Sequence, residues 1–170
     1  MKKTNIFAAV ASLALLLATF VGCTSEYSDV NYLDALKPLY IVGDMTAEVN
    51  VDTAKYPVTN NGGPGNDFAK LDWTSGQGTF SFTYDNNMKA WGGGDGILFF
   101  KVTDVAGWTL PPFGLSADAK GTVKVGGDFV ECFQSGASDN ITIEELENGE
   151  KYTIYVKGTK TKVLVKIAKD

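Results

Sequence analysis

Aromatic residues stand at every second position in residues 79–84, which read TFSFTY. An extended strand points alternate side chains to opposite faces, so this spacing gathers all three rings on one face. Residues 162–167, KVLVKI, repeat the pattern with aliphatic residues on one face and lysines on the other. Both segments are therefore predicted to be half-buried β-strands, and no window of the chain beyond its first two dozen residues has a convincing helical period.

The rest of the chain supports the same fold class. About eight short strands are expected, at the 8–12-residue spacing that is typical of a β-sandwich. They lie at residues 39–42, 79–84, 97–102, 122–125, 129–133, 141–146, 152–156 and 162–167. Residues 122–125 and 129–133 are expected to pair as a hairpin around Gly126-Gly127. The prediction is an all-β chain with a single immunoglobulin-like β-sandwich.

The segment before residue 68 contains the longest expected loop. Residues 50–67 are loop-like, and residues 60–67, NNGGPGND, are rich in the residues that favour turns. Such a run buries little apolar surface, so it is either mobile or held in place by other parts of the protein.

The N-terminus has the features of an export signal. Lys2 and Lys3 precede an apolar run at residues 6–21, and Gly22-Cys23 follows it. This order is typical of a bacterial lipoprotein signal, in which Cys23 becomes the lipidated first residue; a plain signal peptide cleaved elsewhere is the alternative. We therefore expect a signal peptide at residues 1–22, a lipid-anchored tether at 23–37 and a β-sandwich domain at 38–170.

The charge of the chain limits the classes of binding partner, and its cysteine content limits the possible disulfides. The net charge is −5, and removal of residues 1–22 leaves 13 lysines against 20 carboxylates, or −7. Such an acidic domain is a poor binder of nucleic acid or anionic headgroups, so the lipid would provide the membrane link. Only Cys132 remains after Cys23, which excludes an intrachain disulfide in the mature domain. Cys132 is expected to be a small core residue.

Two missing residue types exclude much enzyme chemistry. The chain has no histidine, and all 15 basic residues are lysines. It therefore has no histidine-based nucleophile system, no ordinary zinc site and no bidentate guanidinium. Asp95 and Asp104 are the only carboxylates that could flank an aromatic patch as a glycosidase pair, and residues 144–147 are expected to be a solvated acidic face. We expect no enzyme activity, no cofactor and no metal; calcium bound by residues 60–67 and 85–95 is the open alternative.

The stretch from Gly96 to Gly114 holds the candidate binding residues. Its apolar strand carries Lys101, and Trp108 follows in a loop seven residues later. An amine beside an indole at the rim of a sheet suits a flat polar ligand such as a sugar ring. The alternative is that Trp108 packs in the core and Lys101 only extends to water. Trp91, next to the glycine run 92–96, could serve either ligand or packing, and Trp73 is expected to be a core residue.

Several short motifs, in order, resemble the starch-utilisation outer-membrane lipoproteins SusE and SusF. They are LYIVGD (39–44), FFKV (99–102), Trp108, FG (113–114), DNI (139–141) and GEKYTI (149–154). The same succession is similar to glycogen-binding β-sandwich modules. In those modules a strand lysine, a tryptophan seven residues later and a later asparagine contact the glucan, which implies Lys101, Trp108 and Asn140 here.

The resemblance implies a non-catalytic, carbohydrate-binding lipoprotein on the outer membrane of a Bacteroides-like bacterium, exposed at the cell surface. Its ligand would be an α-glucan of the starch type, and its partners other outer-membrane polysaccharide-uptake proteins. These families place a second tryptophan soon after the GD motif, but residues 45–50 contain no aromatic residue. The site is therefore reduced, or Trp91 or Trp73 replaces the missing wall, or the ligand differs. The alternative function is a structural or assembly β-sandwich of an outer-membrane complex without a sugar site.

Overall fold

The computed structural model describes residues 39–115, 122–136, 138–158 and 162–170. The expected signal peptide (1–22), the lipidation residue Cys23 and the tether (23–37) lie outside the described residues. Within the described ranges, no helix has both the length and the apolar character needed to span a membrane.

The described chain is nearly all β, as predicted, with one short 3-10 helix. In order, the elements are β1 (Tyr40–Gly43), η1 (Glu48–Asn50), β2 (Val58–Asn60), β3 (Asp67–Lys70), β4 (Asp72–Thr74), β5 (Gln77–Thr83), β6 (Leu98–Thr103), β7 (Phe113–Gly114), β8 (Val130–Gln134), β9 (Ile141–Ile143), β10 (Lys151–Gly158) and β11 (Lys162–Lys169).

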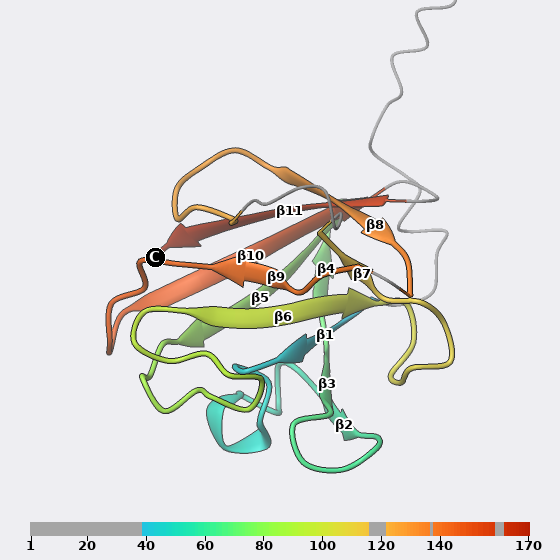
Figure 1. The fold of residues 1–170 in the computed structure, drawn as a ribbon, viewed down its shortest axis with the longest axis horizontal. Coiled ribbons are helices and arrows are strands. Elements are labelled where there is room, and N and C mark those ends of the chain that lie inside the picture. The colour runs from blue at the N-terminus through green and yellow to red at the C-terminus, as the bar shows by residue number, and fades with distance from the viewer. Residues whose placement is uncertain (1–38, 116–121, 137, 159–161) are drawn as a thin grey trace, which may run out of the picture.

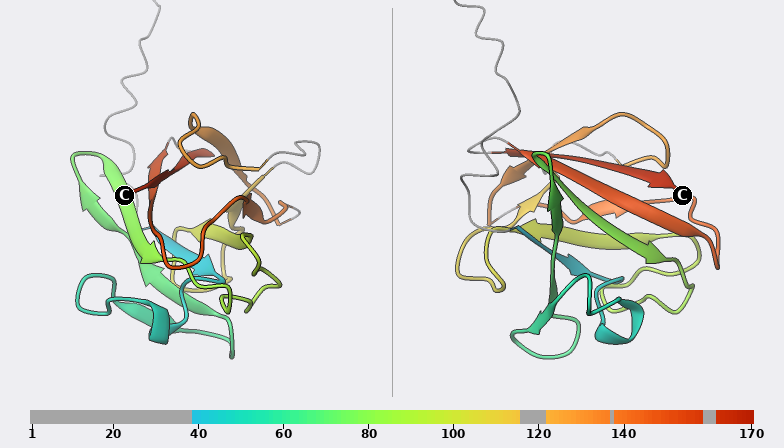
Figure 2. Two further views of the ribbon diagram at one scale, coloured as in Figure 1. Left: turned by 90° about the vertical axis from the view of Figure 1, so that its left-hand side faces the viewer. Right: turned by 180° about the vertical axis from the view of Figure 1, so that it is seen from behind.

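The strands form one curled antiparallel sheet. Its order is β2-β3-β1-β6-β7-β8-β11-β10-β5-β4, and β9 pairs with the first half of β6. In Figure 1, β5, β10 and β11 lie across the molecule from β1 and β6. Seen end-on in the left view of Figure 2, the strands surround a common core.

Alternating side chains build that core. Phe80, Phe82 and Tyr84 point inward from β5 and its end, and Val163 and Val165 do so from β11. Burial of each large apolar side chain stabilises the fold by about 1.5–3 kcal/mol relative to exposure. The predicted inward faces of residues 79–84 and 162–167 are thus confirmed.

The predicted hairpin of residues 122–125 with 129–133 is wrong. Gly127 does donate to Lys124 O at 3.0 Å, so the chain turns there. However, β8 pairs with β7 and β11, while Val123 and Val125 make only isolated parallel bridges. Pairing with β11 sets Cys132 opposite Val163, and both side chains are fully buried. The gain from core burial therefore outweighs the local turn signal.

Three further short strands lie in or next to the expected long loop. β2, β3 and β4 contain three or four residues each, and β2 and the start of β3 fall inside residues 50–67. β3 pairs with both β1 and β2, which places Phe68 and Ala69 in buried positions. Only two adjacent apolar residues mark this strand, too few for a periodic signal.

The buried thiol of Cys132 gives a test of this core. Its side chain is fully buried on β8, and burial raises the pKa of the thiol to about 12. We expect a thiol-alkylating reagent at pH 8 to leave Cys132 unmodified in the native protein and to modify it after denaturation, because the thiolate is the reactive form. Peptide mapping by mass spectrometry checks this. Rapid modification of native Cys132 would contradict its position in the core.

Candidate functional site

Trp108 is a half-open indole in the β6–β7 connection. Its side chain is 43% exposed and rests edge-on against Phe68 of β3, with ring centroids 5.2 Å apart and planes at 68°. The indole Nε1–H donates to Asn66 Oδ1 at 3.1 Å. One edge of the ring is thus fixed by the protein, while part of its surface stays open to solvent.

Trp91 lies beside Trp108. It is half-buried, its ring centroid lies 6.0 Å from that of Trp108, and the two planes are inclined by 34°. Its Nε1–H donates to Gly65 O at 2.8 Å. The structure therefore brings together two tryptophans from the connections before and after β6.

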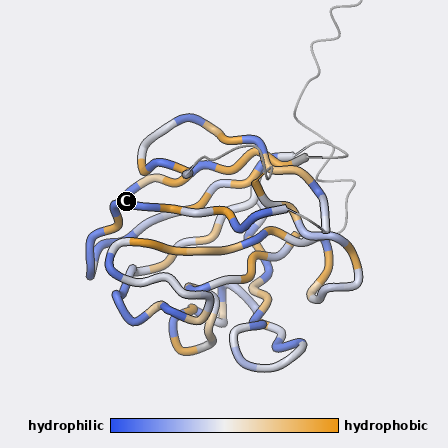
Figure 3. The backbone as a smooth tube through the Cα atoms, in the orientation of Figure 1, coloured by the Kyte–Doolittle hydropathy of each residue, from blue (hydrophilic) through white to orange (hydrophobic). Residues whose placement is uncertain are grey.

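The β2–β3 connection holds both indoles. Its hydrophilic residues are blue to white in Figure 3. Asn60 Nδ2 donates to Asp67 Oδ1 at 2.7 Å, Asn61 N donates to Asn66 O at 3.0 Å, and Asn61 Nδ2 donates to Ala106 O at 2.8 Å. Residues 60–67 were expected to be either mobile or held in place by other parts of the protein, and these hydrogen bonds support the second alternative.

Gly65 has a specific role at this contact. Its φ is +79°, and an added Cβ would lie 3.6 Å from Trp91 Nε1. Glycine adopts this left-handed conformation without steric cost, so the Gly65 carbonyl can face the indole N–H.

Lys101 lies on the same outer face of the sheet as Phe68. The β1–β6 register pairs Val42 with Lys101, and continuing the β1–β3 register by one residue pairs Val42 with Phe68. Two strand spacings, roughly 10 Å, therefore separate the backbones of Phe68 and Lys101. Trp108 packs on Phe68 of β3, whereas Lys101 stands on β6, two places along the sheet order.

The Lys101 ammonium is directed toward the segment before β9. Its Nζ donates to Ser138 O at 2.7 Å. Desolvation lowers the pKa of Lys101, and the nearby Asp139 carboxylate opposes that shift. In the part of the chain that the structure describes, Ser138 O is the one acceptor of this ammonium, so two of its three hydrogens are left for a ligand.

Asn140 is close to Lys101 in register. β6 pairs Phe100 with Ile141, so Asn140 comes one residue beyond that pair, on the side of Lys101. Its side chain is half-buried, and within the described ranges it makes no hydrogen bond. Its amide can therefore both donate to and accept from a ligand hydroxyl.

The other candidate residues have structural surroundings. Trp73 packs against the core, as expected. Asp104 is half-buried near Gln134, with Gln134 Nε2 donating to Asp104 Oδ2 at 3.5 Å, and Asp95 is exposed in the glycine-rich turn. Among the described residues, no three His, Cys, Asp or Glu side chains gather as a metal site.

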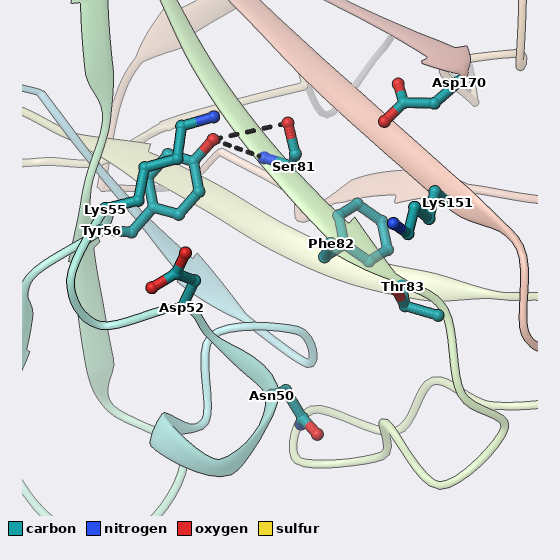
Figure 4. Close-up of a pocket in the computed structure, with 9 residues that line it drawn as sticks. All are labelled: Asn50, Asp52, Lys55, Tyr56, Ser81, Phe82, Thr83, Lys151 and Asp170. Carbon is teal, nitrogen blue, oxygen red and sulfur yellow. Dashed lines mark hydrogen bonds between the residues drawn. The ribbon is translucent and has the colours of Figure 1, made fainter.

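A separate open groove of about 320 Å³ lies along β5 (Figure 4). Its two aromatic residues offer almost no surface, since Tyr56 is 1% and Phe82 5% exposed. The Tyr56 hydroxyl bonds to Ser81, whose Oγ lies 2.9 Å from Thr153 Oγ1. The groove has polar edges but no ring face on which a ligand could stack.

Sequence reasoning missed Gly65, Asn66 and Phe68, which fix the two tryptophans. The contacts span 26 to 42 residues, so no local pattern announces them. The available signal was an aromatic residue directly after a run of Gly and Asn residues.

Comparison of the chain with protein-family models, curated proteins and solved structures found no match.

Proposed function

We propose that this chain is a non-catalytic glycan-binding protein whose site is built around Trp91 and Trp108, of which Trp108 packs on the buried Phe68 of β3. The observation that carries the proposal is the Trp91–Trp108 pair, with centroids 6.0 Å apart and planes inclined by 34°. Both indole N–H groups are bonded to one loop, so the rings are fixed before any ligand arrives. Binding then costs little side-chain ordering.

The side chains of the proposed site suit a sugar chain. A sugar ring has apolar C–H faces that stack on an indole, and hydroxyl edges that need donors and acceptors. Lys101 supplies such a group, and so does the amide of Asn140, which has no hydrogen-bond partner among the described residues and lies on the same sheet face. Two inclined rings fit a curved glycan chain better than they fit a flat glycan chain. Because α-glucans are curved, we propose an α-glucan of the starch type as the ligand.

The sequence supplies the cellular setting of the proposal. The signal-like residues 1–22 and Cys23 support a lipid anchor, and the motif resemblance supports an outer-membrane, surface-exposed location beside other polysaccharide-uptake proteins. For the fold, we propose that the curled sheet is an immunoglobulin-like sandwich of the carbohydrate-binding type. Trp91 takes the place of the tryptophan missing after Gly43-Asp44.

One observation favours the alternative of an assembly protein. Leu110, two residues after Trp108, is 38% exposed, so the β6–β7 connection offers aliphatic as well as aromatic surface. Protein interfaces use such apolar centres. A partner protein, rather than a sugar, would then cover Trp108.

Affinity electrophoresis distinguishes the two functions. The full chain, in non-ionic detergent, is run through gels with starch, glycogen, dextran or a β-glucan and through a gel without polysaccharide. We expect retardation by starch and glycogen. Equal migration in all gels would contradict glucan binding and favour the assembly function.

Lys101 is expected to contribute a smaller part of the affinity. Lys101→Met keeps the apolar stem but removes the donor, and one hydrogen bond is worth about 0.5–1.5 kcal/mol, or roughly two- to tenfold in affinity. Titration calorimetry with a linear α-glucan oligosaccharide measures the change. Lys166→Met, on β11, is the matched control and should bind like the wild type. Equal affinity of Lys101→Met and wild type would remove Lys101 from the site.

A further inference from the structure

Asp44 is a buried carboxylate directly after β1. Its side chain is 1% exposed. Oδ2 accepts a hydrogen bond from Phe99 N at 2.7 Å, and Oδ1 accepts one from Trp91 N at 2.5 Å. The Gly93 backbone also lies close to this carboxylate. The carboxylate thus joins β6 to the loop that carries Trp91.

Trp91 N belongs to the loop between β5 and β6. The two ends of this loop are held elsewhere, by Met88 in the core and by Gly96, whose N–H donates to the Tyr84 hydroxyl and whose carbonyl accepts from Leu146 N. Gly92 N donates to Lys89 O, and Gly94 pairs with Ile97 within the loop itself. Gly93 allows the close approach of the carboxylate, because an added Cβ would lie 2.3 Å from Asp44 Oδ2. Asp44 is therefore the contact that joins the middle of this loop, at Trp91, to the end of β1 and to β6.

Trp91 is consequently held at two points. Asp44 bonds its backbone N–H, and Gly65 O bonds its indole N–H. The two contacts come from different segments, one from the end of β1 and one from the β2–β3 connection. Together they determine the inclination of the Trp91 ring toward Trp108.

Burying the Asp44 carboxylate lowers the stability of the fold unless hydrogen bonds compensate for the lost water. Desolvation raises the pKa of Asp44, although the N–H groups of Phe99, Trp91 and Gly93 oppose this shift. Burying a charge is unfavourable unless hydrogen bonds offset the loss of water. The N–H groups of Phe99 and Trp91 provide that offset here.

We propose that Asp44 is a positioning residue, which sets the geometry of the Trp91–Trp108 pair by holding the Trp91 backbone. Its value for ligand binding rests on the proposed function, whereas its effect on the aromatic pair does not. The two parts can therefore fail separately.

Circular dichroism of the full chain in detergent measures the pair without a ligand. Two indoles 6.0 Å apart couple their electronic transitions, which gives a two-signed far-ultraviolet signal that Trp108→Phe should remove. Asp44→Asn keeps the shape of the side chain but places an amide donor against a backbone donor. We expect this variant to fold and to lose most of the coupled signal.

Two controls separate positioning from general destabilisation. Asp95→Asn makes the same charge change at an exposed position of the same loop. Val165→Ala weakens the core on β11. Both should keep the coupled signal, even where Val165→Ala lowers the melting temperature as much as Asp44→Asn. An unchanged signal in Asp44→Asn, or an equal loss in Val165→Ala, would overturn the proposal.

Amide hydrogen exchange in the wild-type chain tests whether Asp44 holds the Trp91 backbone, even if Asp44→Asn does not fold. The Trp91 amide should exchange as slowly as that of Phe99, because both are bonded to one buried carboxylate. Exchange of Trp91 at the rate of exposed loop amides would overturn the proposal. In a folded Asp44→Asn, glucan affinity should fall about three- to tenfold, as expected when one side chain must be ordered on binding. A lost coupled signal in a protein that binds no glucan would retain Asp44 as the positioning residue and reject only the glucan function.

Discussion

Trp108→Ala is expected to abolish detectable retention by starch. The substitution removes the more open ring of the pair, 43% exposed in the free protein. A central aromatic residue of a binding site typically contributes at least about 2 kcal/mol, or roughly 30-fold in affinity. The fold should survive, because the residue lies in a connection outside the strands, and thermal unfolding checks this.

Phe133→Ala is the matched control for this experiment. Phe133 is 42% exposed on β8, so an aromatic side chain of nearly equal exposure is removed away from the pair. It should be retained like the wild type. Loss of retention in both variants would mean that general surface stickiness, rather than a site, holds the glucan.

Gly43→Ala should have the largest effect on stability. Gly43 pairs with Phe100 across β1 and β6, and an added Cβ would lie 2.3 Å from Phe99 O and 2.6 Å from Phe100 Cα. These are backbone atoms that cannot rotate away, so the two strands must separate where β1 ends. We expect a loss of about 3 kcal/mol or more in the free energy of unfolding.

Gly136→Ala gives the comparison. An added Cβ there meets nothing within 4 Å, so the methyl group itself is tolerated. Chemical denaturation followed by circular dichroism should show an unfolding free energy close to that of the wild type for Gly136→Ala and a much lower one for Gly43→Ala. Equal stability of the two variants would contradict the β1–β6 register.

The sequence predicts the fold class because the signal is local. Residues 79–84 and 162–167 each carry a two-residue apolar period, and both become long strands with a neighbour on each side. β3 was not predicted, because Phe68 and Ala69 are its only apolar residues and its burial comes from pairing on both sides. The hairpin at Gly126-Gly127 was predicted wrongly because the turn signal there is local. Such a signal does not show that β8 pairs instead with the distant strand β11.

The candidate site was predictable only as separate residues. Lys101, Trp108, Trp91 and Asn140 were each identified, but their arrangement depends on contacts across many residues, such as Trp108 with Asn66. Asp44 follows Gly43 at the end of a strand, and a Gly-Asp pair in that place is typical of a turn, so the sequence gives no sign that Asp44 is buried. Its burial becomes visible only when the Trp91 loop folds over it.

The most direct test is a titration of the full chain with a linear α-glucan oligosaccharide, observed through the indole N–H signals in nuclear magnetic resonance. The sequence has three tryptophans, so three indole signals are expected. Glucan binding at the proposed site should shift the signals of Trp91 and Trp108 in a saturable way and leave that of Trp73, packed against the core, unchanged. If none of the three signals moves, or only that of Trp73 does, the aromatic pair is not a glucan-binding site.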